Sequence, residues 1–279
     1  MGLSIGLNTL AFHGYSWRTA LSETAKLGVQ FIEPVYIAKY DPLLQESYFT
    51  DTNATTVLRQ IRDAGLKVRS VASHMDMGLT DTVDVFRRRM NFAKTLGAGI
   101  IITNTSRLEN REQFFKNMET LSRTAEEMEL VIALENPGDG FGYIMNNAAE
   151  GAAVVRELHS AWIKLNYDFS NIHTLSKGAD RYDTGLAEAI PDIAHLHLKN
   201  VKRENDQWPV CSLPEGIVDY RKVFHEYPAL RDLPVSIELP VRFGYDRDFN
   251  FLPREGGPPA LEEICGALQE SILFLNDVV

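Results

Sequence analysis

Short apolar runs alternate with longer amphipathic stretches along the whole chain. The apolar runs are rich in β-branched residues and bounded by turn signals, which is typical of strands buried on both faces of a parallel sheet. The amphipathic stretches begin at capping residues such as Ser16 and end at glycines such as Gly28, as helices do. The pattern predicts strands at 3–8, 30–33, 67–73, 100–104, 131–135, 163–168, 193–199 and 235–238. The predicted helices lie at 16–28, from Thr52 or Asn53 to Ala64, and at 80–96, 111–130, 147–159, 184–190, 219–227 and 258–276.

This alternation predicts the fold class. A strand followed each time by a helix implies parallel strands joined by right-handed crossovers. Eight such units in a chain of 279 residues fit a closed (β/α)₈ TIM barrel, with residues 1–279 forming a single domain. The competing fold is an open doubly wound sheet, which normally has a glycine-rich phosphate-binding turn after an early strand. The residues that follow the first strand here, Asn8-Thr9-Leu10, contain no glycine.

Two connections are longer than ordinary loops between a strand and a helix, at 201–218 and 240–258. Long loops in compact domains are usually functional or mobile. Both leave the carboxyl-terminal face of the predicted barrel, so we expect them to line or cover a site there. Their aromatic residues would supply an apolar lid: Trp208, Phe243, Tyr245, Phe249 and Phe251.

Composition narrows the classes of partner. The formal net charge of −10 argues against binding to a phosphate backbone, so we expect no nucleic acid partner. The chain starts without a basic segment followed by a long apolar core, and it contains no run of 18 apolar residues, so neither a secretory signal nor a membrane partner is expected. Cys211 and Cys265 are far apart and suggest no disulfide framework. We therefore expect a cytoplasmic enzyme that acts on a small molecule, with a homo-oligomer left open.

Four of the later strands end at a residue that can bind a metal ion. The runs V-I-A-L-E-N, W-I-K-L-N-Y-D, I-A-H-L-H-L-K-N and P-V-S-I-E-L-P carry Glu135, Asp168, His197 and Glu238. Active sites of (β/α)₈ barrels lie at the carboxyl ends of the strands, and carboxylates with an imidazole suit a hard or borderline divalent cation. A single strand-end glutamate could instead pair with lysine or arginine, but four such residues in this order favour a metal site. The two glutamates could also exchange protons with a substrate carbon.

Alternate residues of the seventh strand, His195, His197 and Lys199, share one face because side chains alternate along a strand. If that face is the barrel interior, His195 lies one layer below His197, either as a core histidine or as a support for the ligands. Lys199 is nearest the mouth and is placed to meet a substrate oxygen. The alternative for Lys199 is a solvated lysine at the end of a strand.

The motifs A-L-E-N, Y-D-F-S-N, H-L-H-L-K-N and I-E-L-P, in this order, resemble those of the xylose isomerase-like TIM barrels. That superfamily includes sugar phosphate isomerases and epimerases, inosose dehydratases and endonuclease IV. The resemblance covers essentially the whole chain and includes the segment L-P-E-G-I-V-D at 213–219. It implies one divalent metal ion held by Glu135, Asp168, His197 and Glu238. In the epimerases of the family, the two glutamates also act as acid and base.

Further residues are candidates for substrate binding. The resemblance implies a role near the metal or the substrate for His74. Asn171 lies three residues after Asp168, where the epimerases and endonuclease IV have histidine, and His173 is a candidate to compensate. Arg242 follows the last strand and could bind an anionic group, although a surface arginine is the alternative. Three asparagines end strands at the same face and could bind hydroxyl groups: Asn8, Asn104 and Asn136.

These observations predict a metal-dependent isomerase or epimerase of a small sugar or keto-sugar, acting by proton transfer next to a metal-bound carbonyl. The alternative is a metal-dependent lyase, either dehydratase or decarboxylase, on a keto-polyol or sugar acid, which differs in that a leaving group departs. A sugar-binding barrel without turnover is a third class. Mn²⁺ and Mg²⁺ are the expected ions, with Co²⁺ and Zn²⁺ as alternatives. Endonuclease IV chemistry is not expected, because Asn104 stands where its trinuclear zinc site needs a histidine.

Overall fold

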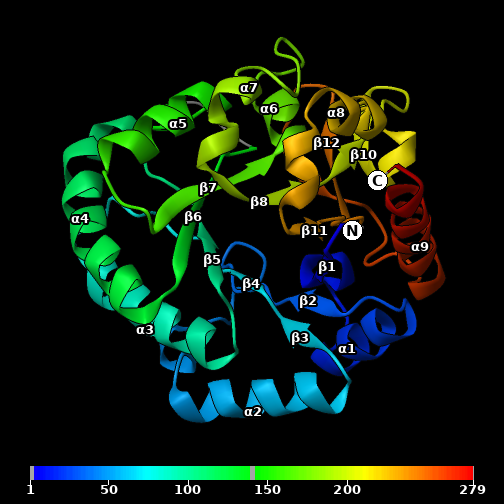
Figure 1. Ribbon diagram of the computed structural model, residues 1–279. Helices are drawn as coiled ribbons and strands as arrows, with labels where there is room; N and C mark the ends of the chain where they lie inside the picture. Colours follow the sequence, from blue (N-terminus) through cyan, green and yellow to red (C-terminus); the bar gives the residue numbers. More distant parts are fainter. Residues whose placement is uncertain (1–2, 139–141, 279) are drawn as a thin grey trace.

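A parallel sheet closes on itself and is surrounded by helices (Figure 1) in the computed structural model, which describes residues 3–138 and 142–278. The sheet has the strand order β3-β2-β1-β11-β8-β7-β6-β5-β4. Its strands are β1 (Ile5–Asn8), β2 (Phe31–Glu33), β3 (Lys67–Val68), β4 (Ser70–Ala72), β5 (Ile100–Thr103), β6 (Val131–Glu135), β7 (Ile163–Asp168), β8 (Ile193–Leu198) and β11 (Val235–Ile237).

The sheet closes into a barrel where β2 meets β3 and β4. β3 and β4 are two parts of one predicted strand, separated at Arg69: β3 pairs with β2, and β4 pairs with β5. A parallel bridge between Val35 and Ala72 then joins the end of β2 to β4, with Tyr36 N donating to Ala72 O at 2.7 Å. Counting β3 and β4 as one strand gives the eight strands of a (β/α)₈ barrel, so the predicted fold class is confirmed.

Except for α6 (Phe169–Leu175), which the sequence pattern did not predict, the helices begin and end close to the predicted positions. They are α1 (Trp17–Lys26), α2 (Asp51–Asp63), α3 (Thr82–Thr95), α4 (Arg111–Met128), α5 (Ala148–Glu157), α6 (Phe169–Leu175), α7 (Leu186–Ala189), α8 (Tyr220–Glu226) and α9 (Leu261–Val278). Ser16 caps α1 as predicted, since its side chain accepts a hydrogen bond from Thr19 N. Thr50, two residues earlier than expected, caps α2. The short 3₁₀ segments are Thr9–Phe12, Glu46–Tyr48, Leu108–Asn110, Ile190–Asp192, Leu213–Glu215 and Pro228–Asp232.

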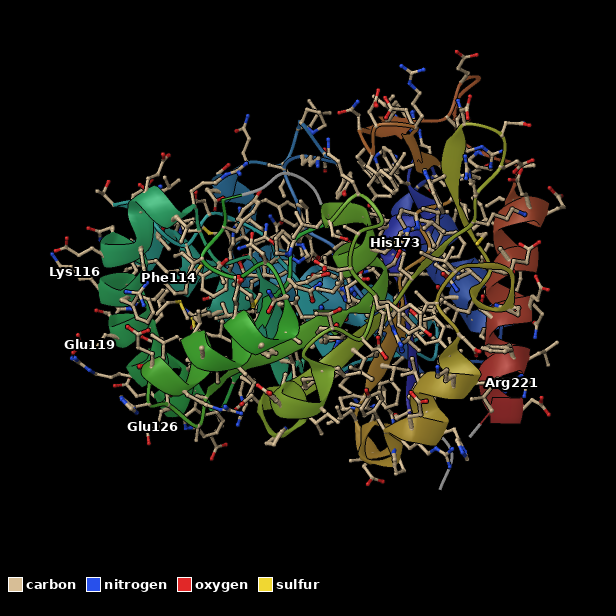
Figure 2. All side chains as sticks on the ribbon, turned by 90° about the horizontal axis from the view of Figure 1, so that it is seen from above. Phe114, Lys116, Glu119, Glu126, His173 and Arg221 are labelled. Carbon is tan, nitrogen blue, oxygen red and sulfur yellow. The ribbon has the colours of Figure 1, made fainter. Side chains whose placement is uncertain are left out.

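The main hydrophobic core lies between the strands and the ring of helices. Helix α4 shows how a helix contributes: Phe114 is fully buried, whereas Lys116, Glu119 and Glu126 extend into solvent (Figure 2). A second, small apolar cluster contains Ala133, which shares the face of Glu135 on β6 and therefore points into the barrel. Among residues 3–138 and 142–278, no helix combines the length and the apolar character that crossing a membrane requires.

The two long connections form a small antiparallel sheet, which the sequence pattern did not predict. Its order is β13-β12-β10-β9, and its strands are β9 (Asn200–Val201), β10 (Gln207–Cys211), β12 (Phe243–Asp246) and β13 (Phe251–Pro253). β10 comes from the connection after β8, and β12 and β13 come from the connection after β11. The pairing of β10 with β12 therefore joins two segments that the sequence separates by a whole strand and helix unit.

Candidate metal centre and active site

The four predicted metal ligands meet at the carboxyl end of the barrel. Glu135, Asp168 and His197 lie at or near the ends of β6, β7 and β8, and Glu238 directly follows β11. The parallel register places them together. Asp168 on β7 pairs with His197 on β8, and Ser236 on β11, two residues before Glu238, pairs with the same histidine from the other side. One ligand atom from each of the four residues lies within 4.8 Å of the others, and all four side chains are buried.

The electrostatics of this cluster suit a cation. Burial raises the pKa of the Glu238 carboxyl group. Burial acts in the same direction on Glu135, but His197 and His74 outweigh it and hold the pKa of that carboxyl group well below its usual value. Although burial lowers the pKa of His197, the carboxylates of Glu135, Glu33 and Glu238 raise it well above its ordinary range. Buried charges in proteins are paired or bind metals, and three carboxylates with one imidazole match the donor set of a divalent ion.

Lys199 lies beside the cluster and brings a buried positive charge to it. Its Nζ is 2.9 Å from Asp168 Oδ2 and 3.5 Å from Glu238 Oε2, and it donates to Asn171 Oδ1 at 2.6 Å. Burial would lower the pKa of this ammonium group, but Asp168, Tyr245, Glu238 and Glu135 together outweigh burial, and the pKa lies well above its usual value. Lys199 is only 6 % exposed, so it is not the solvated lysine of the alternative interpretation.

His74 and Asn171 complete the polar surroundings of Glu135. His74 Nε2 is 2.6 Å from Glu135 Oε2, and Asn171 Nδ2 donates to Glu135 Oε1 at 3.4 Å. Asn171 also donates to Asn136 O at 3.0 Å. Asp168 caps α6 by accepting from Asn171 N at 3.1 Å, which fixes Asn171 next to the cluster. The sequence pattern gave no sign of this short helix.

A cavity opens above the cluster with polar and aromatic walls. Its polar lining comprises Lys39, His74, Asn104, Glu135, Asn136, Asn171, Lys199 and Glu238. Its apolar and aromatic lining comprises Leu10, Ile37, Tyr40, Pro137, Tyr143, Pro240, Tyr245 and Phe251. Such a cavity can bind a small polyol with one polar end at the metal ligands and its carbon skeleton against the rings.

The small antiparallel sheet forms one side of this cavity. Tyr245 of β12 and Phe251 of β13 line it, so the prediction that the connection 240–258 lines the site is confirmed. The connection 201–218 contributes indirectly, because β10 supports β12 and none of its described residues lines the cavity. Trp208 of β10 stacks on Phe249, with ring centroids 5.2 Å apart.

A profile described as "Xylose isomerase-like TIM barrel" matches residues 21–255 of this chain. The matched region contains all four predicted ligands and all four strands of the small sheet. The chain belongs to this family.

Similar proteins were found by sequence and by structure. A D-psicose 3-epimerase of Enterocloster bolteae is 29 % identical over 104 residues, which is 36 % of this chain and 32 % of that relative's length. The structure of a D-psicose 3-epimerase from Clostridium cellulolyticum H10, solved with D-tagatose, covers 99 % of both chains with a TM-score of 0.75 at 14 % identity. The structure of the probable 3-DHS dehydratase AsbF from Bacillus anthracis also covers 99 % of both chains, with a TM-score of 0.70 at 15 % identity. At such identities the two solved structures establish a shared fold.

Some residues predicted to bind substrate lie away from the cavity of this xylose isomerase-like barrel. Asn8 is fully buried, and both ends of its amide are used: Nδ2 donates to Glu33 Oε1 at 2.7 Å and Oδ1 accepts from Leu10 N at 2.9 Å. Arg242 does not line the cavity, and its Nη1 lies 3.1 Å from His13 Nδ1.

His173 and Asn136, also predicted to bind substrate, mainly contact other parts of the protein. His173, on α6 (Figure 2), packs edge-on against Trp208 and Phe249 and is absent from the cavity lining. Asn136 does line the cavity, but its side chain is hydrogen-bonded to the backbone of Asp168. Its Nδ2 donates to Asp168 O at 2.8 Å, and its Oδ1 accepts from Asp168 N at 2.9 Å. Its amide therefore holds β6 and β7 together at the level of the ligands.

Several residues close to the site were absent from the sequence-based prediction, among them Glu33 and, in the cavity lining, Lys39, Tyr40 and Tyr143. Glu33, the last residue of β2, is fully buried, and its Oε1 lies 2.7 Å from His197 Nε2. The sequence holds a signal for it, because Glu33 ends a strand at the same face of the barrel as the four ligands.

Proposed function

We propose that this protein is a divalent-metal-dependent isomerase or epimerase of a ketose or keto-sugar. The observation that carries the proposal is the position of Glu135 and Glu238. Both line the same cavity, and both belong, with Asp168 and His197, to a cluster that can bind a metal ion. Two carboxylates at one substrate site suit the inversion of a carbon, in which a proton is removed from one face and another is returned to the opposite face.

The metal ion would be held by Glu135, Asp168, His197 and Glu238, and when bound it supplies a Lewis acid that polarises the substrate carbonyl. One glutamate then removes the proton from the neighbouring carbon. The other glutamate returns a proton to the opposite face of that carbon, which inverts its configuration. Lys199 and His74, which line the same cavity, donate hydrogen bonds to the substrate oxygens on which negative charge develops.

The class of substrate is suggested by the relatives and by the cavity walls. The relative from Enterocloster bolteae is a D-psicose 3-epimerase, and the similar structure from Clostridium cellulolyticum H10 was solved with D-tagatose. Tyr40, Tyr245 and Phe251 provide aromatic faces for the carbon skeleton of a sugar. The oxygen-rich ligand set favours Mn²⁺ or Mg²⁺, with Co²⁺ and Zn²⁺ as alternatives.

A lyase is the second candidate, and Lys199 is the observation that favours it. Its ammonium group lines the cavity next to Asp168 and Glu238. It could assist the departure of a hydroxyl group or carboxylate from a keto-polyol or sugar acid. A dehydratase of similar fold accords with this alternative.

One assay separates the candidates. The metal-stripped protein is incubated in D₂O with D-psicose, D-fructose, D-tagatose or L-ribulose, each with added Mn²⁺, Mg²⁺, Co²⁺ or Zn²⁺, and followed by NMR and mass spectrometry. An epimerase gives a new ketose with one deuterium at the inverted carbon, and activity disappears with a chelator. A product that has lost water or carbon dioxide would support the lyase. Metal-dependent turnover that persists unchanged in a Glu135→Gln, Glu238→Gln double variant would refute the mechanism proposed for both glutamates.

A further inference from the structure

Glu33 lies beneath the candidate metal centre with all of its hydrogen-bonding capacity used. Oε1 accepts from Asn8 Nδ2 at 2.7 Å and faces His197 Nε2 at 2.7 Å. Oε2 accepts from Ser236 Oγ at 2.8 Å and from Ser70 Oγ. A carboxylate has about four acceptor positions and no proton of its own to donate. Three donors around one carboxylate that is 1 % exposed, from Asn8, Ser70 and Ser236, therefore describe an ionised group locked in place.

This arrangement determines which nitrogen of His197 faces the metal ligands. Nδ1 lies 3.1 Å from Glu135 Oε1 and 3.7 Å from Glu238 Oε2, whereas Nε2 faces Glu33. An imidazole that binds a metal ion is neutral and has one N–H and one lone pair, on different nitrogens. Because Glu33 can only accept, the proton belongs on Nε2. The lone pair of Nδ1 then points toward the carboxylates that would share the ion.

A second metal site in this lower layer does not fit the contacts. Glu33, His195 and His197 also have ligand atoms within 4.8 Å of one another. However, the lone pairs of Glu33 are taken by Asn8, Ser70, Ser236 and His197. His195 Nδ1 is engaged by Asn166 Oδ1 at 2.7 Å, and its Nε2 lies 3.2 Å from Ser236 Oγ. An ion here would have to break several buried hydrogen bonds.

We propose that Glu33 is the positioning residue of the metal centre. It fixes the ring orientation and the tautomer of His197 so that Nδ1 is the ligand atom, and its negative charge makes that nitrogen a stronger donor to the ion. Hydrogen-bond partners of metal-binding histidines typically contribute about 10–100-fold to metal affinity. The inference rests on the proposed function only in that the ion binds at Glu135, Asp168, His197 and Glu238.

Binding of Mn²⁺ to the full-length protein, followed by the EPR signal of free Mn²⁺, tests the role of Glu33 without any substrate. Glu33→Gln keeps the size of the side chain and removes its charge, and we expect its Kd for Mn²⁺ to rise about 10–100-fold. The matched control is Ser271→Ala, which removes another fully buried group: Ser271 Oγ accepts from Leu213 N at 3.0 Å and donates to Ala267 O at 2.7 Å. The control is expected to lower the melting temperature and leave the Kd for Mn²⁺ unchanged.

A second measurement does not depend on any variant. In the ¹⁵N-labelled wild-type protein loaded with Zn²⁺, long-range ¹H–¹⁵N spectra report which nitrogen of His197 carries the proton. Protonation at Nε2 is expected, and protonation at Nδ1 would overturn the inference. Should Glu33→Gln not fold, Ser236→Ala removes one donor to Glu33 while keeping its carboxylate, and a smaller loss of Mn²⁺ affinity is expected. Affinity unchanged in a folded Glu33 variant would also overturn it.

The proposed function and this inference fail in different ways. If the wild-type protein binds no divalent ion, or if Asp168→Asn binds Mn²⁺ as tightly as wild type, the metal centre itself is wrong. If the wild type binds Mn²⁺ through Asp168 and Glu33→Gln binds it equally well, only the role of Glu33 is refuted.

Discussion

We predict that replacing either glutamate of the active site with glutamine abolishes epimerisation but leaves proton exchange on one face of the substrate. A single base can remove and return a proton only on the face that it approaches. Glu135→Gln should therefore still exchange the hydrogen of one epimer with D₂O, and Glu238→Gln should exchange that of the other. The loss of a general base costs about 10²–10⁴-fold in rate, or roughly 3–5 kcal/mol in activation free energy.

The structure also predicts different effects of the two substitutions on stability. Glu135 faces His74 at 2.6 Å and His197 at 3.1 Å, and its surroundings lower the pKa of its carboxyl group, so they favour the charged form. A glutamine there offers a single acceptor oxygen to His74 and Asn171 and loses a charge-assisted hydrogen bond, which costs about 1.5–3 kcal/mol in free energy of unfolding. The nearest charged contact of Glu238 is 3.5 Å away, and burial raises its pKa. A neutral glutamine at 238 should therefore cost less than one at 135.

Deuterium incorporation into each epimer separately, measured by ¹H NMR at saturating metal, tests the kinetic prediction. Urea unfolding of the metal-free variants tests the order of stability. Glu126→Gln, on the solvent face of α4 (Figure 2), is the control and should behave as wild type in both assays. The two-base reasoning is refuted if each variant exchanges both epimers at equal rates, or if either variant with metal bound interconverts them normally.

Three further predictions concern the metal ion and the groups near it. Mn²⁺ at about 100 times its Kd should raise the free energy of unfolding by about 2.7 kcal/mol, and Asp168→Asn should lose this shift in a thermal melt. Lys199→Met should bind Mn²⁺ at least as tightly as wild type, because this substitution removes a competing cation next to Asp168. Its kcat should nevertheless fall about 10²–10³-fold. Weaker Mn²⁺ binding by this variant in a titration would contradict the prediction. Burial against Trp208 lowers the pKa of His173, so its contribution to stability is present above the unfolded pKa of about 6.5 and is lost as pH falls through the folded value. His173→Phe should therefore lose less stability than wild type between about pH 7.5 and pH 5, and equal losses in the urea midpoint would count against this assignment.

The barrel and the four candidate ligands could be predicted because both depend on local sequence. Alternating apolar runs and capped helices determine the order of strands, and parallel strands bring their carboxyl ends to one face. Glu135, Asp168, His197 and Glu238 could therefore be placed together without knowledge of any contact. Glu33 could not be placed against His197 in this way. Its strand, β2, is separated from β8 by β1 and β11, so the two side chains meet only across the closed barrel.

The small sheet escaped prediction for a different physical reason. Its strands are short, and they contain residues that weaken strand signals, such as Pro209 in β10 and Gly244 in β12. Their pairing depends on contacts between two distant connections, with Pro209 opposite Gly244. The sequence could show that both connections are long and aromatic, which was enough to predict that 240–258 lines the site but not that the chain there is ordered as a sheet.

The strand-end asparagines show what a closer inspection of each strand could add. A polar residue at the carboxyl end of a strand can face the cavity, as Asn104 does after β5, or can be used by the protein itself, as Asn8 is by Glu33. The residue two positions before a ligand shares its face and lies about 6–7 Å deeper in the barrel, where bulky aliphatic residues are usual. Three of these four positions hold Asn166, His195 and Ser236, which contact one another beneath the ligands, and the fourth holds Ala133. Polar residues in that layer are therefore a sequence signal for a hydrogen-bonded support below a metal centre, and they indicate where an acceptor such as Glu33 is needed.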